Sequence, residues 1–116
     1  MTQPSISSIH PAAAFFAAVT PKTEPYDLPG VGTVELVELR ERDVAEIRKA
    51  AEAEKDATRR TRAFGYGLVV RSVRKDGQAV FTDADIERFA EAGNAAVEKL
   101  AAAVLRINGY GADAGN

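Results

Sequence analysis

The segment that most constrains the fold is a long apolar repeat near the end of this 116-residue chain. Thr82 and Asp85 have the spacing of a helix capping box, with Asp where Glu is usual, and Phe81 stands where a hydrophobic staple belongs. The apolar stripe that follows consists of Ile86, Phe89, Ala90, Gly93, Val97, Leu100, Ala101, Val104 and Leu105. Since Asn108-Gly109 is a typical helix stop, the pattern predicts one helix over about residues 83–108, about 37 Å long.

A helix of that length exceeds what one small core can cover, so part of its stripe is expected to face another chain. Gly93 lies among alanines, and the chain holds 22 alanines but only 7% aromatic residues. Small residues let helix backbones approach closely, which predicts a tight helix crossing at Gly93. Packing within the domain and a contact between subunits both remain open there.

Two β-prone stretches flank the turn signal Pro29-Gly30. They predict an antiparallel hairpin that pairs roughly 23–28 with 32–38. Pro25 lacks the N–H that an interior ladder needs, so it is expected on an edge strand. A lone hairpin is marginally stable, so this one is expected to lie on helices or to pair with another copy.

Between the hairpin and the long repeat, the chain predicts a helix over about residues 40–55. Val44, Ile47 and Ala51 recur there at helical spacing, and acidic residues load its N-terminal end, which suits the helix dipole.

Residues 57–73 have two interpretations. Their apolar residues fit one helical face, although Gly65 and Gly67 each cost a helix interior about 1 kcal/mol relative to Ala. The alternative is a strand over 66–73 that turns at Asp76-Gly77 and pairs with residues 79–81. We favour the helix.

Residues 1–22 predict an N-terminal arm that carries a short helix. The first ten residues are rich in Ser, and an uncharged apolar run from Pro11 to Val19 follows. Because isolated helices below about 12 residues rarely persist in water, Phe15 and Phe16 are expected to need a partner surface, either on their own domain or on another chain. Residues 23–109 are expected to form the domain and residues 110–116 a flexible tail. The expected class is mainly α: a small helical domain with an N-terminal β-hairpin (about 23–38) and a long C-terminal helix (about 83–108).

The composition leaves little material for catalysis. The chain has no Cys and a single His, His10, so neither a thiolate nor a histidine pair is available for a nucleophile or a metal site. We therefore expect no enzyme activity, cofactor or metal. No apolar run reaches the roughly 18 residues that span a bilayer, and no Lys or Arg precedes Lys22, so neither a membrane partner nor a signal peptide is expected. These features predict a cytosolic protein.

Two short motifs resemble ligand sites and are better explained as turns. Asp76, Asp83 and Asp85 lack the alternating ligands of an EF-hand loop. The pairs Gly30/Gly32 and Gly65/Gly67 lack the third Gly of a dinucleotide fingerprint.

The charge of the chain is unevenly distributed. The net charge is −2, yet residues 40–76 hold eleven of the fifteen Lys and Arg and carry a local charge of +4. Arg59, Arg60 and Arg62, followed by Phe64 and Tyr66, could suit single-stranded nucleic acid, an acidic protein partner or simple exposure to water. We favour exposure to water, because acids precede the arginines and no recognition signature accompanies them.

In the order of its motifs, the chain resembles the tail assembly chaperones of long-tailed bacteriophages and prophages. The resemblance covers roughly residues 23–109 and is carried by Leu28-Pro29-Gly30, Val34 to Asp43, Asp76-Gly77, Val80 to Ile86, and Leu105 to Gly109. Two places depart from the family pattern, namely Arg74-Lys75, where acids are common, and the Gly65/Gly67 pair.

The resemblance implies binding of the long, helical tape measure protein, which the chaperone keeps soluble while tail tube protein is recruited around it. It also implies work in the host bacterial cytoplasm and absence from the mature virion. Self-association is expected as well. The residues expected to bind partners are Phe15, Phe16, Ile86, Phe89, Gly93, Val97, Leu100 and Val104. The alternatives are a structural tail or virion component and a small nucleic-acid-binding regulator.

Overall fold

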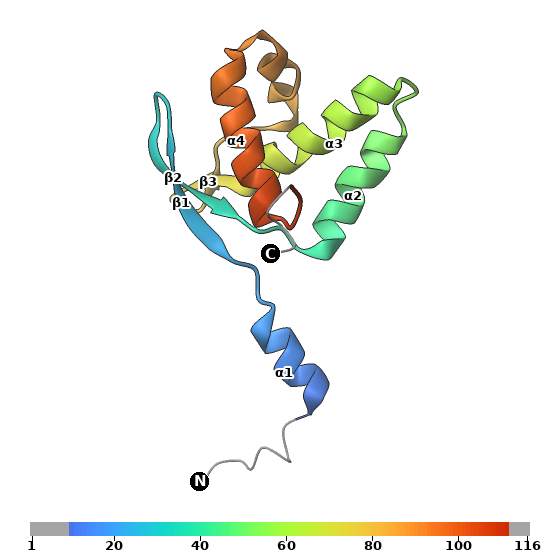
Figure 1. Ribbon diagram of the computed structural model, residues 1–116, viewed down its shortest axis with the longest axis vertical. Helices are drawn as coiled ribbons and strands as arrows, with labels where there is room; N and C mark the ends of the chain where they lie inside the picture. Colours follow the sequence, from blue (N-terminus) through green and yellow to red (C-terminus); the bar gives the residue numbers. More distant parts are fainter. Residues whose placement is uncertain (1–9, 112–116) are drawn as a thin grey trace.

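A four-stranded antiparallel sheet and the helices packed against it make up the domain in the computed structural model, which describes residues 10–111 (Figure 1). Residues 1–9 of the predicted arm (1–22) and residues 112–116 of the predicted flexible tail (110–116) lie outside these residues. The longer helices are α1 (Pro11–Ala18), α2 (Glu41–Glu52), α3 (Ala57–Ser72) and α4 (Asn94–Ile107). The strands are β1 (Thr23–Leu28), β2 (Gly32–Val37), β3 (Val73–Lys75) and β4 (Gln78–Ala79), and two 3-10 turns, η2 (Asp83–Asp85) and η3 (Glu87–Glu91), precede α4.

The predicted hairpin is confirmed. β1 pairs with β2 in a register that places Pro25 opposite Glu35, and β1 is an edge strand of the sheet. The N–H of Glu38 donates to the carbonyl of Lys22 at 2.8 Å, which makes Lys22 and Glu38 a hydrogen-bonded pair. Because hydrogen-bonded and non-hydrogen-bonded pairs alternate along an antiparallel ladder, Pro25 and Glu35 form a pair that exchanges no hydrogen bond. The missing proline donor therefore faces outward, and the sheet loses no internal bond.

The middle segment follows the helical interpretation, and the alternative strand over 66–73 is wrong except at Val73, where β3 begins. The helix is confirmed over Ala57–Ser72, and it begins where the carboxylate of Asp56 accepts the N–H of Arg59 at 3.0 Å. The predicted turn at Asp76-Gly77 also exists, with φ of 52° and 80°, and it joins the short strands β3 and β4. Because β3 pairs with β2, the two hairpins combine into one sheet in the order β1-β2-β3-β4.

This sheet overturns the expected fold class. A mainly α domain with a single hairpin is wrong, since the structure is a mixed helix-plus-sheet fold. The error arose because β3 and β4 have only three and two residues, too short to leave a period in the sequence. Their pairing depends on β2, which is distant in the chain.

The second correction concerns the long C-terminal helix, which does not exist as one element. Ala92 and Gly93 adopt extended backbone, with ψ of 165° and 127°, and they separate η3 from α4. The break lets Phe89 turn back toward the domain, where its ring lies 5.1 Å from that of Tyr66 and 5.2 Å from that of Phe81. A continuous helix would follow one axis and could not make this turn. Because Gly has a weak helix propensity, little helix-forming free energy is lost when the helix is interrupted at Gly93.

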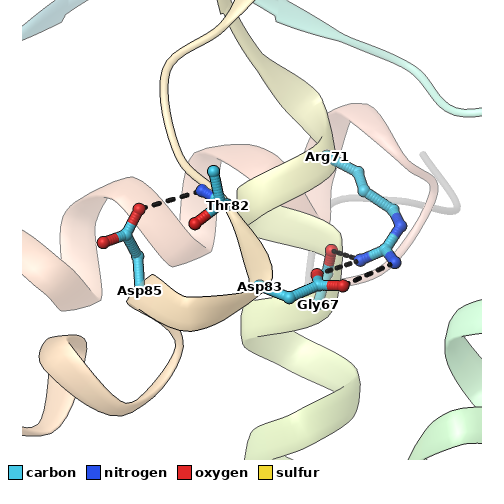
Figure 2. Close-up of polar contacts among 5 residues, drawn as sticks. All are labelled: Gly67, Arg71, Thr82, Asp83 and Asp85. Carbon is cyan, nitrogen blue, oxygen red and sulfur yellow. Dashed lines mark hydrogen bonds and ion pairs between the residues drawn. The ribbon is translucent and has the colours of Figure 1, made fainter.

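The capping box itself is present, at the start of η2. The side chain of Asp85 accepts the N–H of Thr82 at 2.9 Å (Figure 2). In return, the Thr82 side chain accepts from the backbone of Asp85. Arg71 of α3 donates to both carboxylate oxygens of Asp83, at 2.9 and 3.3 Å, and to the carbonyl of Gly67. These contacts attach the turn to α3.

The core lies between the sheet and the three domain helices. Its buried members are Leu28, Val34, Leu36, Ile47, Leu68, Val69, Val73, Leu100, Ala103 and Val104. Gly67 is placed where α3 crosses α2, and a Cβ built on it would lie 2.7 Å from Cγ2 of Ile47. The tight helix crossing is therefore at Gly67 and not at Gly93, around which a Cβ would meet nothing within 4 Å.

Asn108 closes the domain at the end of α4. Its amide oxygen accepts the N–H of Leu39 at 2.8 Å, and its amide nitrogen donates to the fully buried Ser72 hydroxyl at 3.1 Å. The same nitrogen donates to the carbonyl of Val104 at 2.9 Å. One side chain thus joins the chain before α2, the end of α3 and the end of α4. The predicted helix stop is confirmed by Gly109, whose φ is 88°.

Candidate functional site

Helix α1 extends away from the domain and is exposed at every position (Figure 1). It contains only Pro, Ala and Phe, and none of its residues is buried. Its start is capped by His10, whose Nδ1 accepts the N–H of Ala12 at 3.2 Å. The prediction of a short helix is confirmed. The capping role of His10 has no clear signal in the sequence, because N-cap residues are normally Ser, Thr, Asp or Asn.

The apolar surface of α1 is concentrated in two aromatic rings. Phe15 and Phe16 are 58% and 67% exposed, and their rings meet edge to face with centroids 5.2 Å apart. Val19, just after the helix, is 50% exposed. Across residues 10–111, the most exposed large apolar side chains are these three and Val31. Three of these four side chains lie on α1 or directly after it, and exposed apolar area that gathers in one place is typical of a binding surface.

The segment that connects α1 to β1 holds the helix at a distance. The Thr20 hydroxyl donates to the carbonyl of Ala17 at 2.8 Å, which closes the end of α1. Thr20 precedes Pro21, and a residue before proline is restricted to extended conformations. Lys22 is already paired with Glu38 across the sheet. The backbone that connects α1 to β1 therefore has little conformational freedom.

The other residues expected to bind partners lie elsewhere. Val97, Leu100 and Val104 are 9%, 5% and 0% exposed, so their side chains are occupied by the core of this same chain. Ile86 and Phe89 are half-buried in the turns before α4. The structure brings Phe15 and Phe16 together on α1 but does not join them to this group. The buried residues are not available to a partner while the domain is folded.

Gly93 also has a different role from the one expected. It occupies the N-cap position of α4, with φ −60° and ψ 127°, and it is exposed. The stripe of small residues around it does not form a helix contact with the described part of the chain. Sequence periodicity alone could not distinguish a glycine that breaks a helix from one that allows a close approach.

The basic segment lacks the exposed aromatic rings that a single strand of nucleic acid would stack on. Phe64 packs edge to face on Tyr110 at 5.7 Å between ring centroids, and Arg48 covers it at 5.2 Å. Tyr66 packs on Phe89. Arg60 donates to the carbonyls of Glu54 and Lys55 beyond the end of α2, at 3.0 and 2.9 Å, which gives it a structural role.

The electrostatic features of residues 10–111 include the capping carboxylate of Asp85. The pKa of Asp85 is lowered from its ordinary value of 3.8, chiefly because the carboxylate accepts the N–H of Thr82, with a further contribution from Arg88. This capping carboxylate has a structural role. Across the same range, no three side chains of His, Asp or Glu gather in a way that could hold a metal ion. None of the helices between residues 10 and 111 is long and apolar enough to cross a membrane.

Comparison with models of protein families, with curated proteins and with solved structures finds no match to this chain. The strongest candidate for a functional site is therefore the one that the geometry supplies. It consists of α1, with its two exposed phenylalanines.

Proposed function

We propose that this chain is a tail assembly chaperone of a long-tailed bacteriophage or prophage. It binds the tape measure protein, keeps it soluble and helps to recruit tail tube protein during virion morphogenesis. The proposal rests on the resemblance of residues 23–109 to that family and on one structural observation. The observation is an uncharged apolar helix, α1, that protrudes from a folded domain and buries none of its residues.

A chaperone for an apolar helical client needs an apolar surface of its own. Burial of that surface against the client must be favourable, yet weak enough for the client to dissociate later. Taking about 200 Å² for a whole Phe side chain, Phe15 and Phe16 together expose roughly 250 Å². Burial of that area contributes on the order of 6 kcal/mol at about 25 cal/mol per Å², before the cost of association is subtracted. A contact of this size is reversible, as a transient assembly factor requires.

The uncharged character of α1 supports the same function. A helix with no charged side chain loses no ion hydration when it is buried, so it fits the apolar face of a client helix without needing a charged partner. The proposal therefore assigns the client contact to α1 and the contact with tail tube protein to the folded domain. No catalytic step is part of the proposal.

Co-expression with the tape measure protein of the same phage or prophage tests the proposal. We expect the tape measure protein to move into the soluble fraction and to co-elute with this chain on size exclusion. A tape measure protein that stays insoluble with and without this chain, together with no shared elution peak, would contradict it.

The proposal also places the protein in the host bacterial cytoplasm and leaves it out of the finished particle. Mass spectrometry of purified virions measures this directly. Detection of the chain at the copy number of a tail protein would favour a structural tail component instead.

A further inference from the structure

A surface groove lies beside the base of α1, at the junction of α2 with the end of α4. It has a volume of about 560 Å³. Leu39, Val44 and Tyr110 supply half-buried apolar surface, and the exposed Val19 and the half-buried Pro21 form the wall nearest α1. The groove is thus apolar where it meets the segment from which α1 emerges.

Two of the polar side chains that line the groove already have partners within the chain. The Glu38 carboxylate accepts the N–H of Lys22 at 3.0 Å, and Arg48 donates to the Tyr110 hydroxyl at 3.1 Å. An incoming uncharged helix therefore displaces neither interaction if it covers only the apolar wall. Among the described residues, α1 is such a helix.

The α1 of the same chain is poorly placed to enter this groove. It would have to reverse direction within Val19, Thr20 and Pro21, because Ala18 ends the helix and Lys22 is already paired with Glu38. Proline fixes its own φ, and it restricts Thr20 to extended conformations, so the connection resists a reversal. A short connection that cannot turn back favours exchange of the element with a second copy.

The apolar area that α1 can bury favours a reciprocal exchange between two copies over the insertion of a single helix. One α1 brings roughly 250 Å² of exposed aromatic surface, well below the about 800 Å² per partner of a standard stable interface. Two reciprocal insertions engage two helices and two grooves across one interface. A two-fold dimer is therefore favoured over a single insertion.

We propose that two copies of this chain exchange α1, each placing Phe15 and Phe16 in the groove formed by Leu39, Val44 and Tyr110 of the other. The exchange hides the apolar helix of both copies, and dissociation of the dimer frees α1 for the client contact proposed above. The inference goes beyond the proposed chaperone function and does not depend on it, since it needs no client.

Because the chain contains no Cys, introduced cysteines are the sole thiols, and crosslinks report on positions without background. Ala17→Cys places a thiol on exposed α1, and Glu41→Cys places one at the exposed rim of the groove. The two full-length variants are purified separately, mixed, and treated with a short bismaleimide. Intact mass then identifies a product that contains one chain of each variant.

We expect the mixed product to form, and we expect the uncrosslinked wild type to elute at twice 12.4 kDa with concentration-dependent dissociation. Replacing Phe15 and Phe16 by Ser in both variants should reduce the mixed product at least several-fold. The matched control Glu98→Cys is exposed on α4, about 15 Å along the helix from Asn108, and should give no product with Ala17→Cys.

Two results overturn the inference. A monomer at all concentrations that gives no mixed product shows that no second copy takes α1. A chain that carries Glu41→Cys together with Ala12→Cys, at the end of α1 far from the groove, and forms only an internal crosslink shows that α1 folds back on its own domain. Either result leaves the co-expression test of client binding intact, so the two proposals fail separately.

Discussion

The two glycines of α3 provide a matched pair of substitutions whose effects on stability should have opposite signs. Gly65 and Gly67 lie in the same helix, and a Cβ on Gly65 would meet nothing within 4 Å. A Cβ on Gly67 would lie 2.7 Å from Cγ2 of Ile47, which is 3% exposed and held in the core. Gly65→Ala and Gly67→Ala therefore change helix propensity equally and differ in packing.

The magnitudes follow from those two terms. Ala in a helix interior is more favourable than Gly by about 1 kcal/mol, so Gly65→Ala should raise the free energy of unfolding by nearly that amount. Overpacking a core contact costs about 1–3 kcal/mol, so Gly67→Ala should show a net loss of roughly 1 kcal/mol after the same gain is subtracted. The two variants should differ by about 2 kcal/mol.

Urea unfolding followed by far-UV circular dichroism measures both free energies, provided that the dependence on denaturant is unchanged. Ile47→Leu removes the Cγ2 methyl from Cβ, so the combination with Gly67→Ala should recover part of the loss relative to the two single changes. If Gly67→Ala stabilises the protein as much as Gly65→Ala does, α2 and α3 do not cross where the structure places them.

Three further predictions concern the other contacts. Asn108→Ala leaves the buried Ser72 hydroxyl without its partner and should lower the free energy of unfolding by about 2–3 kcal/mol in the same urea assay; a loss below about 0.5 kcal/mol would contradict the role of Asn108. Because the folded pKa of Asp85 is lowered, its contribution to stability is complete above the unfolded value of 3.8 and is lost as the pH falls through the folded pKa. Asp85→Asn should accordingly flatten the pH dependence of the melting temperature as the pH falls below the unfolded value of 3.8, and an unchanged slope would argue against the capping role. Replacing both Phe15 and Phe16 by Ser should change the unfolding free energy of the monomer by less than about 0.5 kcal/mol, because neither ring packs on the domain.

Several elements were predictable because their signals are local. The hairpin follows from a turn between two short β-prone stretches, and the capping box of Thr82 and Asp85 follows from a spacing of three residues. The short helix that carries Phe15 and Phe16 was also predictable, but its pattern left open whether the two rings pack on their own domain or on another chain; the structure leaves both rings exposed.

The errors concern features that depend on residues distant in the chain. The apolar stripe from Ile86 to Val104 continues through a change of direction, so its period does not reveal that Gly93 ends one element and begins another. The core takes Val97, Leu100 and Val104 because the sheet lies opposite them, and that sheet depends on the pairing of β3 with β2. A helix face that meets its own domain has the same sequence pattern as one that meets a second protein.

The measurement that tests the central claim most directly compares three versions of the chain in co-expression with the tape measure protein. They are the wild type, the variant with both Phe15→Ser and Phe16→Ser, and the control Val31→Ser. Val31 is 42% exposed at the hairpin turn, so this control removes exposed apolar area away from α1. We predict that the soluble fraction of the tape measure protein falls to its level without chaperone only for the double variant. Equal solubility with all three versions would contradict the claim that α1 is the client surface.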